Sequence, residues 1–183
     1  MKKEQKNIFE IFKNKKTNSF LKILIIILIL YFIFKGIAVL VILMALSIGF
    51  SYIINTLKIR SIGFELVTFI AVISGLKYGS KIAFIITFIL ITYHLVAGGF
   101  IGTYVFWVIP AYCLAAIFSG FYPQADITFL GIIATIGINL NNIFFTAITS
   151  FDYLPKYLIY AITNIIFNIL IFMLFRKIFL LIM

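Results

Sequence analysis

Apolar stretches cover almost the whole of this chain from residue 20 to residue 183, and the breaks between them are short. A membrane-spanning helix needs roughly 20 apolar residues, because it rises about 1.5 Å per residue through a hydrocarbon core about 30 Å thick. Lipid offers the backbone no hydrogen bonds, so such stretches form helices. The sequence therefore predicts an all-α, polytopic membrane bundle. Residues 1–19 would form a basic cytoplasmic tail, and residues 20–183 a single transmembrane bundle.

The number of spans depends on the stretch 20–57, which is nearly twice too long for one crossing. It forms either two spans with a tight turn at Lys35-Gly36, or an interfacial or tilted segment at 20–34 followed by one span at 37–57. The later spans are predicted at 63–76, 81–97, 104–122, 127–149 and 157–175.

Positive charge favours six spans over seven. Short cytoplasmic loops carry an excess of Lys and Arg. With six spans and a cytoplasmic N-terminus, the basic tail, Lys77, Lys81, Arg176 and Lys177 all lie inside. Seven spans would move these four residues outside. We therefore expect about six transmembrane helices in the cell membrane, with 20–34 as an extra N-terminal hydrophobic segment.

The remaining composition excludes several classes of function. The net charge is +10, but the lysines lie mainly at the N-terminus and at predicted helix ends, which is typical of membrane proteins rather than nucleic-acid binders. One cysteine and one histidine give no spacing for a metal site. There is no nucleotide-binding or hydrolase motif, and few titratable groups remain for acid–base chemistry. We expect neither an enzyme nor a cofactor.

The polar residues inside apolar runs are the candidates for function, because such groups are costly in lipid. Glu65 lies near a helix start, where it either accepts hydrogen bonds from free helix N–H groups, binds a cationic or hydrogen-bonding ligand, or pairs with Lys58 or Arg60. His94 is either a hydrogen-bonded packing residue or a ligand contact. Trp107 is either a pocket residue or an interfacial aromatic.

Two pairs of amide side chains lie at helical spacing. Asn139 and Asn142 are three residues apart, and Asn164 and Asn168 are four apart, so each pair shares one helix face. The two helices either satisfy each other's amides across an interface or line a polar pocket, with Asp152 near its mouth. The candidate substrate-binding residues are Glu65, His94, Trp107, Asn139, Asn142, Asp152 and Asn164.

Small residues at helical spacing predict close helix packing. Gly131, Ala134 and Gly137 share one face of a later span, and Ala45 and Gly49 share a face of the span at 37–57. Such faces serve packing within the bundle or docking onto a partner membrane protein.

Three segments in the first half of the chain resemble a known family. They are Met44-Ala-Leu-Ser-Ile-Gly-Phe50, Gly63-Phe-Glu-Leu-Val-Thr-Phe69 and Ser74-Gly-Leu-Lys-Tyr-Gly-Ser-Lys-Ile-Ala83. In this order they resemble the substrate-binding S-components of energy-coupling factor (ECF) vitamin transporters, which are six-helix bundles of about this length. Rod-shape proteins of the MreD type have a similar helical layout.

The ECF resemblance implies a subunit that binds a vitamin-like small molecule near its outer face. It would then associate with a transmembrane coupling protein and two ATPases through small residues of the first span, here Ala38, Ala45 and Gly49. The alternative is an MreD-like scaffold for envelope or shape machinery, without transport. The scaffold predicts a filled bundle with paired amides, whereas the transporter subunit predicts an outer cavity.

Overall fold

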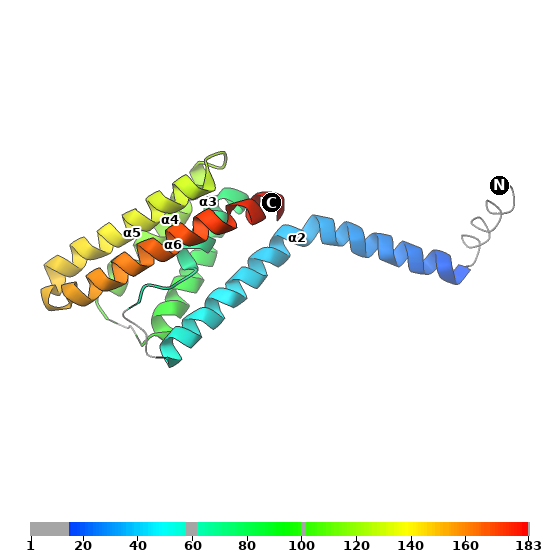
Figure 1. The fold of residues 1–183 in the computed structure, drawn as a ribbon. Coiled ribbons are helices and arrows are strands. Elements are labelled where there is room, and N and C mark those ends of the chain that lie inside the picture. The colour runs from blue at the N-terminus through cyan, green and yellow to red at the C-terminus, as the bar shows by residue number, and fades with distance from the viewer. Residues whose placement is uncertain (1–14, 58–61, 100–101, 183) are drawn as a thin grey trace. The chain divides into compact units, whose positions relative to one another are not determined.

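The computed structural model describes residues 15–57, 62–99 and 102–182. The described chain forms helices only: α2 (Lys15–Thr56), α3 (Val67–Ala97), α4 (Val105–Phe121), α5 (Ile127–Thr149), a short 3-10 helix η1 (Phe151–Tyr153), and α6 (Leu154–Ile182) (Figure 1). The predicted all-α class is confirmed. Most of the predicted basic tail lies outside the described residues, as do Lys58 and Arg60.

Four segments are long and apolar enough to cross a membrane, namely Phe34–Thr56, Val67–Ala97, Ile127–Thr149 and Phe151–Lys177. Large apolar side chains lie on the outside of these helices and of α4, including Phe106, Leu114 and Leu174. An apolar exterior of this extent suits lipid and would drive aggregation in water. The chain is therefore a membrane protein.

Helix α2 runs without a break through Lys35 and Gly36, so the tight turn considered there is wrong. The chain separates into two compact units, Met1–Val39 and Leu40–Met183, and the second unit holds the bundle. The bundle thus begins inside α2. Whether 20–34 crosses the membrane stays a prediction.

Helix α3 folds back on itself at Gly79. This glycine has φ 79° and ψ 171°, a conformation that side chains with a Cβ rarely adopt. An uninterrupted helix would hold Val67 and Leu95 about 42 Å apart, yet both belong to one buried hydrophobic cluster. The two arms are residues 67–78 and 80–97. The break predicted between the second and third spans is confirmed.

Small residues bring α4 against this reversal. A Cβ on Gly75 would meet the carbonyl oxygen of Ala116 at 2.7 Å, and a Cβ on Gly120 would meet the backbone of Ser80. The Ser80 hydroxyl donates to the carbonyl oxygen of Ile117 at 2.9 Å. Close approach without side chains is the usual way in which helices gain van der Waals contact in lipid.

Helices α5 and α6 lie side by side (Figure 1). Of the predicted small-residue face on α5, Gly131 is the packing position, because a Cβ there would lie 2.5 Å from the ring of Phe172, which is fully buried. Gly137 is exposed and a Cβ there would meet nothing within 4 Å in the described structure.

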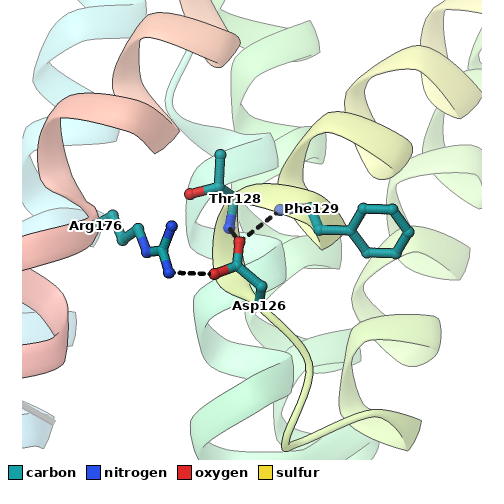
Figure 2. Close-up of polar contacts among 4 residues, drawn as sticks. All are labelled: Asp126, Thr128, Phe129 and Arg176. Carbon is teal, nitrogen blue, oxygen red and sulfur yellow. Dashed lines mark hydrogen bonds and ion pairs between the residues drawn. The ribbon is translucent and has the colours of Figure 1, made fainter.

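Asp126 joins the start of α5 to the end of α6. Its Oδ1 accepts hydrogen bonds from the backbone N–H groups of Thr128 and Phe129, at 2.9 and 3.0 Å, and so caps α5. Its Oδ2 lies 2.6 Å from the guanidinium of Arg176 on α6, as Figure 2 shows. This ion pair, the α4 end and the Gly79 reversal all lie at the same end of the bundle.

Candidate functional site

A pocket of about 540 Å³ lies at the opposite end of the bundle from the Gly79 reversal. Its walls come from the last turns of α3 and α5, the first turns of α4 and α6, and residues of the connections between them, namely Gly99, Gly102, Thr103, Tyr104, Ser150 and Tyr153. The pocket is therefore formed where four helical segments end together, a common place for ligand sites in helical bundles.

Aromatic side chains dominate the lining of the pocket. They are Tyr104, Trp107, Tyr112, Tyr153, Tyr157 and Tyr160. The polar side chains of the lining are His94, Thr103, Asn142, Thr146 and Ser150. Lys156 is the one charged side chain among the described lining residues, and it is exposed. Apolar walls with a few polar groups are typical of sites for small organic molecules.

Trp107 is held in place by its neighbours while its indole N–H stays available. The ring stacks on Phe145, with centroids 5.7 Å apart, and meets Tyr104 edge-on at 6.5 Å. Its buried Nε1–H has no hydrogen-bond partner among the described residues. A buried donor without a partner costs about 1–3 kcal/mol. An acceptor on a ligand would remove this cost.

His94 is both a packing residue and a pocket residue. It is 9% exposed, and its Nδ1 lies 2.8 Å from the hydroxyl of Ser51 on α2. This hydrogen bond fixes the orientation of the ring at the pocket wall. His94 is thus a hydrogen-bonded packing residue that also borders the pocket, and its role as a ligand contact stays a prediction.

Glu65 lies beneath the pocket, with 1% of its surface exposed. Its Oε2 accepts the backbone N–H of Thr68 at 2.9 Å, and its Oε1 accepts the Thr68 hydroxyl at 2.6 Å. Oε1 also accepts from the amide nitrogens of Asn164, at 3.3 Å, and Asn168, at 3.1 Å. The carboxyl group thus caps the first arm of α3, which begins inside the bundle, where its free N–H groups have no water to bind.

Asn164 is the centre of this buried network. Its Nδ2 donates to the carbonyl oxygen of Gly63 at 2.8 Å, and its Oδ1 accepts from Nδ2 of Asn139 at 2.8 Å. The backbone N–H of Gly63 donates to the hydroxyl of Thr163 at 2.8 Å. The segment before α3 is therefore bound along α6, and a hydrogen bond between Asn139 and Asn164 joins α5 to α6.

The structure divides the seven candidate residues into three groups. His94, Trp107 and Asn142 line the pocket. Glu65, Asn139 and Asn164 form the network beneath it. Asp152 is exposed in η1 and does not belong to the lining.

Tyr157, Tyr160 and Lys156 at the start of α6 were missed as pocket residues. A signal for two of them was present, since Tyr157, Tyr160, Asn164 and Asn168 follow each other at spacings of three and four residues. That spacing places them on one helix face. Because tyrosine is common near membrane surfaces in any membrane protein, these two residues did not stand out as pocket residues.

The small residues of α2 take little part in packing. Ala45 is exposed, and a Cβ on Gly49 would meet nothing within 4 Å in the described structure. Ala38, also exposed, belongs to the other unit of the chain. Packing within the bundle thus does not explain Gly49, and docking by these three residues stays a prediction.

The described residues contain no group of three or more His, Cys, Asp or Glu side chains that could hold a metal ion. Comparisons with protein-family models, with curated proteins and with solved structures found no match. The case for a function therefore rests on the pocket and on the network beneath it.

Proposed function

We propose that this chain is the substrate-binding membrane subunit of an ECF-type importer, and that it binds a vitamin-like small molecule in the pocket at the outer end of its bundle. The observation that carries this proposal is the pocket itself. Its volume of about 540 Å³ falls within the range of sites for small organic ligands. A membrane scaffold has no need of such a cavity, and an empty one loses packing contacts.

The charge distribution supports an outward-facing pocket. Lys77 and Lys81 flank the Gly79 reversal, and Arg176 and Lys177 lie at the end of α6, so all four belong to the end opposite the pocket. By the positive-inside rule that end is cytoplasmic. A ligand would then reach the pocket from outside the cell, and the chain would lie in the cell membrane.

Import would need partners, since the sequence carries no nucleotide-binding motif. A transmembrane coupling protein and ATPase subunits would supply the conformational work. The exposed Ala45 and the half-buried Gly49 offer a surface on which another helix could approach closely, with Ala38 further along the same helix.

A second candidate is an MreD-like scaffold for envelope machinery. The hydrogen bond between Asn139 and Asn164 favours it, because paired amides are what a filled bundle requires. The pocket counts against it.

Native mass spectrometry of the gently purified chain tests the proposal. We expect a small molecule in stoichiometric amount, or a co-purifying coupling protein with ATPases. Thr146→Phe, in the pocket wall, should remove the small molecule by filling the cavity. The matched control is Ile148→Phe on the same helix, where the side chain is 66% exposed and outside the lining.

Loss of ligand in Thr146→Phe with retention in Ile148→Phe supports a pocket ligand. A chain that carries no small molecule and co-purifies with envelope-synthesis proteins would replace the transporter proposal by the scaffold.

A further inference from the structure

A buried acidic side chain, Glu65, lies beneath the floor of the pocket. Oε2 of Glu65 accepts the backbone N–H of Thr68, and Oε1 accepts the amide N–H groups of Asn164 and Asn168, which can only donate. The Thr68 hydroxyl lies 2.6 Å from Oε1. The amide orientations are set independently, because Nδ2 of Asn164 also donates to the Gly63 carbonyl and Nδ2 of Asn168 to the Asn164 carbonyl. Donors on both oxygens suit an ionised carboxyl group.

No cationic side chain compensates this carboxylate within the described structure. The ion pair of the described residues joins Asp126 to Arg176 at the other end of the bundle. The network also has acceptors in excess, since Oδ1 of Asn139 and Oδ1 of Asn168 are buried without a hydrogen-bond partner in that part of the chain. A buried charge without a counter-charge is costly, and a cation nearby would lower that cost.

The carboxylate is close enough to act on the pocket. It lies one turn of α6 below the floor, because Asn164 follows Tyr160 by four residues on the same face. His94, Tyr112, Tyr157 and Tyr160, which line the pocket, all lie close enough to Glu65 for a charge on its carboxyl group to act on them. In a site of low dielectric constant such an interaction is only weakly screened.

The aromatic walls of the pocket also suit a cationic ligand. The faces of Tyr and Trp rings attract cations, and six such residues line this pocket. The exposed Lys156 at the rim of the pocket would repel a cation. Its Nζ lies 6.0 Å from the ring centroid of Tyr153. Water and salt screen an exposed ammonium far more than a buried carboxylate.

We propose that the pocket selects organic cations, with the cationic group at the floor above Glu65 and among the tyrosine rings. This inference rests on the proposed binding function and names its ligand class. The volume of the pocket fits an organic molecule rather than a bare metal ion.

The test compares matched probes of different charge on the purified full chain in dodecyl maltoside. One set is 1-methylnicotinamide, nicotinamide and nicotinate. The other is choline, 3,3-dimethylbutan-1-ol and 3,3-dimethylbutyrate. Binding is followed by the fluorescence of Trp107, the one tryptophan of the chain, and by thermal stabilisation. We expect the cation of each set to bind at least about tenfold more tightly than its neutral analogue.

Glu65→Gln should reduce that preference to about threefold or less, with the affinity of the neutral probes unchanged. If this variant does not fold, the comparison of charges on the natural chain still decides the question. The formal charge of any ligand found by native mass spectrometry gives a second, independent answer.

Tighter binding of the neutral or anionic probes, or a co-purified ligand without a cationic group, would overturn the cation inference and leave the binding function standing. Stabilisation by sodium ions alone would also overturn it. No bound probe together with no co-purified ligand would remove the binding function, and this inference with it.

Discussion

Asn164→Ala should be among the most destabilising substitutions in the bundle. It removes hydrogen bonds to the Gly63 carbonyl and to Glu65, and one from Asn139, at 2.8, 3.3 and 2.8 Å. Three hydrogen bonds in a membrane protein, at about 0.6 kcal/mol each, sum to about 2 kcal/mol. Leaving the buried partners without their bonds adds about 1–3 kcal/mol. We therefore expect a loss of about 3–5 kcal/mol in the free energy of unfolding.

Asn141→Ala is the matched control. The same truncation on α5 removes two long hydrogen bonds, at 3.3 Å to the Trp107 carbonyl and 3.2 Å to Asn142, from a half-buried side chain. We expect a loss of about 1 kcal/mol or less. Unfolding of each variant by sodium dodecyl sulfate in mixed micelles, followed through Trp107 fluorescence, measures both values.

A third variant separates hydrogen bonding from packing. Asn164→Leu keeps the side-chain volume similar but cannot form the hydrogen bonds, so it should be as damaging as Asn164→Ala. If Asn164→Leu were as stable as the natural chain, the loss of stability in Asn164→Ala would come from the cavity and not from the hydrogen bonds. Equal losses in Asn164→Ala and Asn141→Ala would refute the assignment of the network as the element that holds α3 to α6.

Three further predictions use the same unfolding assay. Gly63→Ala should cost about 1–3 kcal/mol or prevent folding, because its Cβ would meet the Tyr160 carbonyl and Asn164, whereas Gly49→Ala should be neutral or slightly stabilising; similar effects of the two changes would contradict the close approach to α6. Gly131→Ala should cost about 1–3 kcal/mol through the Phe172 ring while Gly137→Ala should not destabilise, and rescue of Gly131→Ala by Phe172→Leu would identify the clash. Asp126→Ala should cost about 1 kcal/mol through the lost cap of α5, and Arg176→Ala less, because an exposed ion pair contributes little; a larger loss in Arg176→Ala would show that the ion pair outweighs the cap.

Hydropathy and charge predicted the helices well, because both depend on nearby residues. The span at 127–149 coincides with α5, and the break at 77–80 coincides with the Gly79 reversal. The turn considered at Lys35-Gly36 was wrong, since one lysine and one glycine do not outweigh the helical preference of the apolar residues around them.

The candidate site was predicted only in part. Polarity in an apolar run pointed to residues that line the pocket or form the network beneath it, but it gives no depth within the bundle and no hydrogen-bond partner. Asn139 and Asn142 share a face of α5, but they lie about one helical turn apart. Asn142 therefore borders the pocket, whereas Asn139 hydrogen-bonds to Asn164. Asp152 was chosen for its charge and its place near the mouth, and it lies exposed in η1.

By itself the sequence determined that this chain is a helical membrane protein with one end richer in positive charge, because lipid allows no other backbone structure for such apolar runs. The tertiary structure alone decided that Glu65 caps a helix beginning inside the bundle, and that aromatic residues of three helices enclose a pocket above it. Those relations depend on which faces of distant helices meet, and that is set by packing across the bundle rather than by any local pattern.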